Sequence, residues 1–177
     1  MGTYLLYRGY EARKAERIAR LQQQNAETTV TVIEGWRNEE IGAYFEKQGL
    51  FSKADFLKGL TEYDESAYPL LKRPANKTLE GYLFPDTYRI PKNATPQQVI
   101  EKMLGNFTSR LQSIDVKDPD VKYNGLTLYE IITLASIIEK ESGGQGATTG
   151  QLSLQEERNL VASVFYNRLA IGQALES

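Results

Sequence analysis

The stretch that decides the fold of this 177-residue chain is GLTLYEIITLASIIEKES, from Gly125 to Ser142. Thr127 and Glu130 stand at the spacing of a capping box, which predicts that a helix begins here. Successive helical residues are about 100° apart, so the apolar residues of the stretch cover a broad arc of the helix surface. Such an arc is wider than a surface helix carries, and it predicts a central, buried helix. The arc consists of Ile131, Ile132, Leu134, Ala135, Ile137 and Ile138.

Two acids close the stretch, and they fall on opposite flanks of the apolar arc. Glu139 and Glu141 each lie about 80° from the centre of the arc. Either side chain could be half-buried against isoleucines, and both burial and the negative end of the helix dipole favour the protonated form of an acid. Glycosidic bond cleavage needs such a proton donor, because the leaving oxygen must receive a proton. The alternative is a solvated helix end with two ordinary surface glutamates, and helical geometry does not choose between the two acids.

The rest of the chain predicts an α+β, predominantly helical fold with a small strand element near the N-terminus. The β-branched run Thr28–Ile33 predicts the strand, and Tyr10–Asn25 is rich in helix formers. Capping boxes begin two further long helices, which with the central stretch are expected to form the core; these boxes are Thr95 with Gln98, and Ser153 with Glu156. Short helices are expected after the N-caps Asn38 and Ser52. Loops are expected at 61–77, 115–124 and 142–150, and turns at 85–86 and 90–93.

Two absences in the composition restrict the chemistry, since the chain has no histidine and no cysteine. Ser-His-Asp and Cys-His nucleophilic sites are excluded, as are disulfides and zinc sites built on His or Cys. Asp, Glu, Lys and Tyr remain for acid–base work, so we expect a carboxylate enzyme without cofactor or metal. The formal net charge of −2 provides no basic field for nucleic acid. No run of about 18 apolar residues is present to span a membrane.

Aromatic and amide side chains are candidates for sugar contacts. Tyr82, Phe84 and Tyr88 could stack on sugar rings, although such residues more often pack in a core or a turn. Asn167 could hydrogen-bond an N-acetyl group, or it could make only a local structural bond.

Basic side chains offer two further possibilities. Arg158 and Arg168 project about 80° apart on the last helix, and they could pair with the glutamates of the central helix or remain solvated. Ser136 and Lys140 are four residues apart and could meet as a Ser–Lys pair. Their spacing is not the Ser-x-x-Lys pattern of acyl-transfer enzymes, which disfavours that chemistry.

Three blocks of the sequence resemble one known family. They are EGYLFPDTYRIP at Glu80–Pro91, LASIIEKES at Leu134–Ser142, and ERNLVASVFYNRLAIGQALES at Glu157–Ser177. In this order and spacing they resemble the YceG-like family of endolytic murein transglycosylases (MltG). The resemblance implies a lysozyme-like catalytic helix core. It covers residues 30–177 as a catalytic domain, while residues 1–29 resemble the tail of a LysM-like subdomain.

The resemblance implies a lytic transglycosylase that cleaves MurNAc–GlcNAc β-1,4 bonds within peptidoglycan strands and leaves 1,6-anhydro-MurNAc ends. In this family the second glutamate of the Glu-Lys-Glu block is catalytic, which implies Glu141 as general acid and then base. One carboxylate is enough because no water nucleophile has to be activated, unlike in the two-carboxylate glycosidases. Glu139, Tyr82, Asn167 and Arg168 are then expected to support or bind the substrate.

The resemblance also implies a longer parent protein. Family members carry an N-terminal membrane helix that this chain lacks, with the catalytic part at the outer face of the bacterial cytoplasmic membrane. The family pattern continues with an Asp-Pro-Thr segment, whereas this chain stops at Ser177, and the loop 142–154 is longer than expected. We therefore expect a truncated domain with an incomplete cleft and little or no activity. Expected partners are peptidoglycan glycan strands and peptidoglycan synthases, and not nucleic acid.

Two other functions fit parts of the pattern. A non-catalytic peptidoglycan-binding or scaffold module of the cell-wall machinery would hold the glycan without cleaving it. An aminodeoxychorismate lyase, a label attached to this family, would need pyridoxal phosphate on a lysine and a phosphate cradle at a helix N-terminus. Gly143, Gly144 and Gly146 follow a helix instead of leading into one, which disfavours the lyase.

Overall fold

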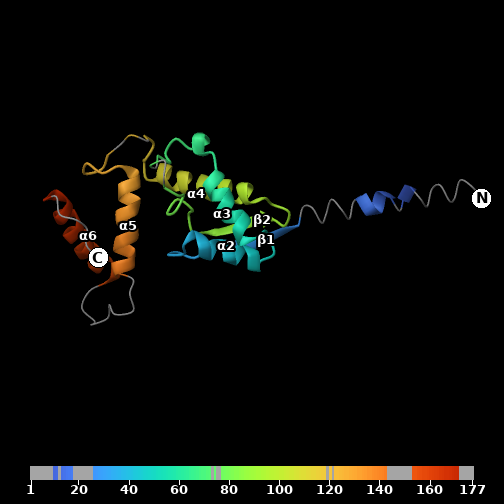
Figure 1. The fold of residues 1–177 in the computed structure, drawn as a ribbon, viewed down its shortest axis with the longest axis horizontal. Coiled ribbons are helices and arrows are strands. Elements are labelled where there is room, and N and C mark those ends of the chain that lie inside the picture. Colours follow the sequence, from blue (N-terminus) through green and yellow to red (C-terminus); the bar gives the residue numbers. More distant parts are fainter. Residues whose placement is uncertain are drawn as a thin grey trace, which may run out of the picture. The chain divides into compact units, whose positions relative to one another are not determined.

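The computed structural model describes residues 10–11, 13–17, 26–72, 74, 77–118, 120, 122–142 and 153–171. Over these residues the chain is α+β and predominantly helical, as the sequence predicts (Figure 1). Residues 10–11 and 13–17 are helical, and the rest of the helix expected over Tyr10–Asn25 lies outside the described residues. The later elements are β1 (Glu27–Thr31), α2 (Asn38–Lys47), α3 (Lys53–Glu62), the 3-10 helix η1 (Glu65–Ala67), β2 (Thr87–Pro91), α4 (Pro96–Ser113), α5 (Leu128–Ser142) and α6 (Leu154–Ala170).

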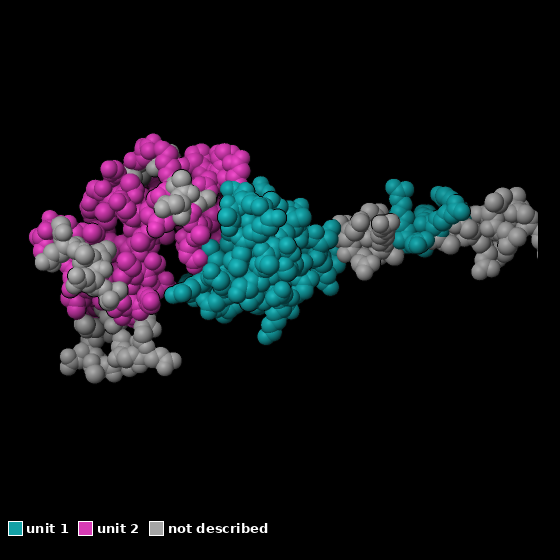
Figure 2. Space-filling model, in the orientation of Figure 1, with its two compact units in different colours: residues 1–63, 85–103 teal, residues 64–84, 104–177 magenta. Residues whose placement is uncertain are grey.

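The chain forms two compact units (Figure 2). The first unit comprises residues 1–63 and 85–103, and the second comprises residues 64–84 and 104–177. Helix α4 begins in the first unit and ends in the second. The expected division into a LysM-like tail at 1–29 and a catalytic domain at 30–177 stays a prediction. Among the helices that the structure describes, none combines the length and apolar character required to cross a membrane.

A two-stranded antiparallel sheet lies in the first unit. In the register of β1 and β2, Val30 is opposite Tyr88 and Thr28 is opposite Ile90. The buried side chains of Val30, Tyr88 and Ile90 alternate with exposed ones, as the two-residue period of a strand requires. The strand expected near the N-terminus is confirmed, whereas the turn expected at residues 90–93 is wrong for Ile90 and Pro91, which belong to β2. Pairing with a strand distant in sequence makes this segment extended.

Helices α2 and α3 pack on each other through phenylalanine rings. Phe45 makes edge-to-face contacts with Phe51 at 5.6 Å and with Phe56 at 5.3 Å between ring centroids. The expected N-cap Ser52 is confirmed, since its hydroxyl accepts a hydrogen bond from the Asp55 backbone N–H. The expected N-cap Asn38 is wrong by one residue. Arg37 holds that position, and its backbone N–H donates to the Glu40 carboxylate at 2.8 Å.

The core of the second unit is formed by the loop that precedes β2 and by the later half of α4. Tyr82, fully buried, packs edge-to-face on Phe107 with ring centroids 5.4 Å apart. The capping box that begins α4 is confirmed, because Thr95 and Gln98 exchange hydrogen bonds between side chain and backbone N–H. Other buried apolar residues of this unit are Leu70, Leu71, Leu79, Leu83, Leu104, Val116, Leu128, Leu134 and Phe165.

The expectation that three long helices form the core is wrong for α5 and α6. In α5 the buried residues are Leu128, Leu134 and Ser142. In α6 Phe165 is buried, while Leu160 is 58% exposed and Val164, Tyr166 and Leu169 are also exposed. The two helices pack on each other (Figure 1), so much of their apolar surface faces no other described element of this unit.

Candidate active site

Helix α5 positions the candidate acid, and its first turn is held by a complete capping box. The Thr127 hydroxyl accepts from the Glu130 backbone N–H at 3.3 Å, and the Glu130 carboxylate accepts from the Thr127 backbone N–H and hydroxyl, both at 2.7 Å. These bonds satisfy donors that a helix start leaves without intrahelical partners. The helix therefore begins where the sequence predicts and continues to Ser142.

The last turn of α5 is anchored by a buried serine. Ser142 is 1% exposed, and its hydroxyl donates to the Ile138 backbone carbonyl at 2.5 Å. Ile138 lies four residues before Ser142, so this bond ties the serine side chain to the backbone of its own helix. Glu141 is the neighbour of Ser142 and projects about 100° away around the helix axis. The buried residue thus fixes the orientation of the turn that carries the acid.

Both acids at the end of α5 are exposed to solvent. Of the two readings that the sequence left open, the structure agrees with the solvated helix end and not with half-burial against isoleucines, because the described residues cover only part of the circumference of α5. Within the described ranges, neither carboxylate takes part in an ion pair. Their exposure leaves them accessible to a ligand.

The loop of the aromatic sequence block packs on the middle of α5. A Cβ added to Gly81, whose φ is +85°, would lie 2.8 Å from Cγ2 of Ile132. Only a residue without a side chain allows this approach at this backbone conformation. The fold therefore brings the EGYLF segment and the acid-bearing helix together, although they are distant in sequence.

The three aromatic candidates of this block have packing roles. The Tyr82 side chain is fully buried, Phe84 lies under the Arg110 guanidinium at 5.2 Å, and Tyr88 is buried in β2. Core packing was the alternative that the sequence left open for these residues. A stacking role for Tyr82 would require its ring to leave the core.

Helix α6 carries the remaining candidates. Its capping box is confirmed, with the Ser153 hydroxyl accepting from the Glu156 backbone N–H. Asn167 is exposed and Arg168 is half-buried. Arg158 is half-buried, and its Nε atom is buried without a hydrogen-bond partner. The possible pairing of Arg158 with Glu139 or Glu141, which the sequence left open beside solvated arginines, is absent from the described part of the chain.

The Ser–Lys alternative receives no support from the geometry. The Ser136 hydroxyl donates to the Thr133 backbone carbonyl at 2.8 Å, a bond to the helix's own backbone. Both Ser136 and Lys140 are exposed. Ser136 is thus occupied as an ordinary helical serine.

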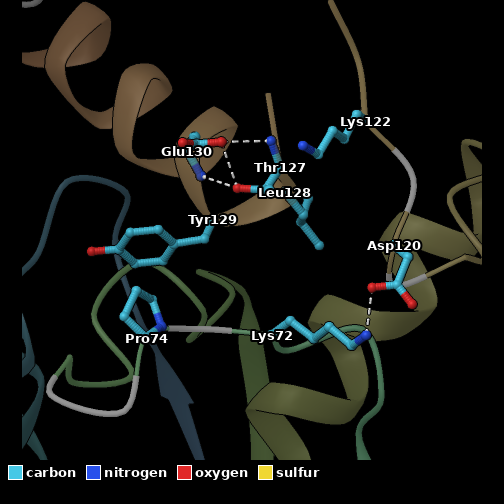
Figure 3. Close-up of a pocket in the computed structure, with 8 residues that line it drawn as sticks. All are labelled: Lys72, Pro74, Asp120, Lys122, Thr127, Leu128, Tyr129 and Glu130. Carbon is cyan, nitrogen blue, oxygen red and sulfur yellow. Dashed lines mark hydrogen bonds and ion pairs between the residues drawn. The ribbon is translucent and has the colours of Figure 1, made fainter. Parts of the chain in front are cut away.

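A pocket of about 430 Å³ opens at the other end of α5, and the sequence contains no signal for it (Figure 3). Three separate segments build it, and its lining residues are Lys72, Pro74, Asp120, Lys122, Thr127, Leu128, Tyr129 and Glu130. Lys72 Nζ lies 2.5 Å from Asp120 Oδ1, and Glu130 is held by the capping box. The lining has two lysines and two carboxylates, so its formal charges cancel. Helical rise places Glu141 about 18 Å along the axis from Tyr129, which separates the pocket from the candidate acid.

Glu130 provides a prediction on pH dependence. Hydrogen bonds from the Thr127 backbone N–H and hydroxyl hold the pKa of Glu130 below its usual value, with a smaller contribution from Lys122. A depressed folded-state pKa stabilises the fold above the unfolded-state pKa, and the stabilisation is lost as pH falls through the folded-state value. Glu130→Gln keeps an acceptor for the box without a titrating charge, so its melting temperature should fall less than that of the wild type between pH 6 and pH 3.

Thr127→Ala is the companion variant in these melting experiments. It removes the side-chain cap and should cost about 1 kcal/mol at neutral pH. Since the hydroxyl also lowers the pKa of Glu130, this variant should show a weaker acid dependence than the wild type. Parallel pH profiles for all three proteins would contradict the assignment of the pKa shift to the capping box.

Comparison with known proteins gives a consistent set of relatives. A family model described as the YceG-like family matches residues 1–177. A protein named endolytic murein transglycosylase from Streptococcus pneumoniae R6 is 38% identical over 109 residues, which are 62% of this chain and 17% of the relative. A protein of the same name from Bacillus subtilis 168 is 29% identical over 154 residues, covering 79% of this chain and 39% of the relative.

The fold is also similar to a solved structure. The crystal structure of a YceG-like protein from Listeria monocytogenes has a TM-score of 0.61 and 28% sequence identity, covering 83% of this chain and 48% of the other. The chain spans less than half the length of each of these relatives.

Proposed function

This chain belongs to the YceG-like family, and from that premise we propose that it provides the acid-bearing helix of an endolytic lytic transglycosylase of peptidoglycan. Its expected substrate is the glycan strand, cleaved at MurNAc–GlcNAc β-1,4 bonds. Its expected products carry 1,6-anhydro-MurNAc ends. Proteins named endolytic murein transglycosylase among its relatives support this assignment.

One observation carries the proposal, the position of Glu141 at the anchored end of α5. Its side chain is exposed, while Ser142 beside it is 1% exposed and bonded to the helix backbone. A carboxyl group on a fixed turn and open to solvent can meet a polymer too large to enter a closed pocket. Preorganisation of the acid is what general acid catalysis requires of the protein.

Glu141 would act twice in this mechanism. It first donates its proton to the glycosidic oxygen as the bond to the anomeric carbon breaks, and the released sugar leaves with a hydroxyl group. The resulting carboxylate then accepts the proton of the MurNAc C6 hydroxyl, whose oxygen forms the new bond to the anomeric carbon. The acid is regenerated, no water is consumed, and atoms balance with a single carboxylate.

The remaining site residues are proposals of the same kind. Glu139 lies two residues before the acid and is exposed, while Asn167 and Arg168 lie on α6, which packs on α5. These three could contact the glycan near Glu141, and Tyr82 would act through the core instead. Peptidoglycan synthases as partners, and an anchored protein at the outer face of the cytoplasmic membrane, belong to the same proposal.

Digestion of purified sacculi tests the proposal directly. The complete protein encoded by the gene and the 177-residue chain are each incubated with sacculi, and the products are identified by mass. We expect 1,6-anhydro-MurNAc products from the complete protein and little or none from the 177-residue chain, because this chain spans less than half the length of its relatives. Products with reducing ends from the complete protein would identify a hydrolase and refute the mechanism.

A non-catalytic peptidoglycan-binding module is the second candidate. The observation in its favour is that Glu141 is exposed, without the desolvated surroundings that favour a protonated acid. Such a module would sediment with sacculi and release no soluble fragments. If the complete protein binds sacculi and releases no soluble products, the result supports the binding module and not the enzyme.

A further inference from the structure

We propose that the surface around Trp36, in the first unit, binds a glycan strand by contact with its sugar rings. The identity of the ligand rests on the proposed function. Trp36 is the one tryptophan of the chain, and it lies in the connection between β1 and α2 with a half-buried side chain. Ile33 in the same connection is 55% exposed. The connection thus presents apolar surface that the core of this unit does not use.

The fold holds the tryptophan in place. The Trp36 backbone N–H donates to the Ile33 carbonyl at 3.4 Å, and Gly35 between them has a φ of +80°, so the connection is a tight turn. The Trp36 ring lies edge-to-face on Tyr44, with ring centroids 5.2 Å apart and planes inclined by 60°. The Tyr44 hydroxyl in turn accepts from the Thr31 backbone N–H at 3.2 Å. Little conformational freedom would be lost when a ligand packs on this ring.

Hydroxyl groups accompany the aromatic pair. Oγ1 of Thr31 lies 3.0 Å from Oγ1 of Thr87 across the two strands, and both residues are exposed. Together with the Tyr44 hydroxyl, they can exchange hydrogen bonds with sugar hydroxyls while the apolar C–H face of a sugar ring packs on Trp36. Trp36, Tyr44, Thr31 and Thr87 carry no charge, so they suit a neutral glycan backbone better than a nucleic acid or an anionic membrane.

Intrinsic fluorescence tests the inference without a label, because all tryptophan emission comes from Trp36. The chain is titrated with a soluble β-1,4-linked N-acetylglucosamine tetrasaccharide, which lacks MurNAc and is not a substrate of the proposed reaction. We expect the emission to shift and to saturate. By calorimetry, Trp36→Ala should weaken binding about tenfold, the order of the loss when a stacking aromatic is removed. Trp36→Phe should retain most of the affinity because a flat ring remains.

Tyr123→Ala is the matched control, since Tyr123 is an aromatic side chain in the second unit that is 42% exposed. It should bind the tetrasaccharide like the wild type. Unchanged Trp36 emission up to millimolar sugar overturns the inference, and so does an equal loss of affinity in Trp36→Ala and Tyr123→Ala. Emission that depends on protein concentration without sugar would indicate contact between copies and would overturn it too.

Circular dichroism checks whether Trp36→Ala is folded. If this variant is unfolded, the wild-type titration and the Trp36→Phe variant test the inference. The outcome is separable from that of the proposed function. Sugar binding at Trp36 with no cleavage of sacculi by the complete protein would refute the function alone. Cleavage of sacculi by the complete protein, with no change in Trp36 emission when the sugar is added, would refute this inference alone.

Discussion

Replacing Glu141 with glutamine in the complete protein is expected to reduce formation of 1,6-anhydro-MurNAc products by at least 10²- to 10⁴-fold, the usual contribution of a general acid–base group. Glutamine keeps the size and polarity of the side chain but can neither donate nor accept the transferred proton. Because Glu141 serves in both steps of the proposed mechanism, the loss should lie at the upper end of this range or beyond it. The measurement is the initial rate of product release from sacculi, quantified by mass spectrometry.

Glu139→Gln is the comparison that identifies the acid. Both side chains are exposed on the last turns of α5, so either variant removes one charge from the same end of the helix. Glu139→Gln should cost much less activity, as expected of a residue that only supports the substrate. Both variants should melt at the wild-type temperature and sediment with sacculi as the wild type does. A larger loss of activity for Glu139→Gln would identify Glu139 as the general acid. Full activity of Glu141→Gln would refute the proposed mechanism.

Replacing Gly81 with alanine is expected to destabilise the second unit by roughly 2–5 kcal/mol. A φ of +85° costs an L-residue about 1–2 kcal/mol. The new Cβ would also lie 2.8 Å from Cγ2 of Ile132, and relieving such overpacking typically costs a further 1–3 kcal/mol. Chemical denaturation followed by circular dichroism measures the change in the free energy of unfolding.

Gly125→Ala isolates the backbone part of this effect. Gly125 lies in the same unit with a φ of +82°, but an added Cβ would meet nothing within 4 Å. Its substitution should therefore cost only the conformational term of about 1–2 kcal/mol. Equal destabilisation by Gly81→Ala and Gly125→Ala would show that the contact with α5 has no energetic importance.

A double-mutant cycle with Ile132→Ala tests the contact itself. Removing the Ile132 side chain makes room for the new methyl group, so the double variant should be less destabilised than the sum of the two single variants by about 1 kcal/mol or more. If the destabilisation of the double variant equals the sum for the two single variants, the strain in Gly81→Ala does not come from the contact with Ile132. Because this contact joins the EGYLF segment to α5, the cycle also measures how firmly the acid-bearing helix is held.

Local sequence signals were sufficient for most of the helices. The boxes at Thr95, Thr127 and Ser153 each close through hydrogen bonds between residues three positions apart, so the pattern contains everything that sets the helix start. Ser52 begins α3 for the same reason. The one-residue error at Asn38 arose because Glu40 caps the backbone of Arg37 from inside the helix, a bond that does not depend on the side chain at the N-cap.

Non-local contacts decided what the sequence did not. Residues 87–91 form β2 by pairing with β1. The local sequence of these residues does not indicate which segment they pair with. The pocket at the start of α5 is assembled from three segments, so no single motif marks it. The contact of Gly81 with Ile132 likewise depends on elements that meet only in the folded chain. The packing of Trp36 on Tyr44 also joins a turn to the helix that follows it.

The stretch from Gly125 to Ser142 shows both kinds of information. Its sequence determined that a helix forms, where it starts and which acids it carries to its end, because these follow from bonds and angles along one chain segment. The tertiary structure decided that its isoleucines are only partly covered and that Glu139 and Glu141 face solvent. Burial depends on the surfaces that pack against a helix, and those surfaces come from distant parts of the chain.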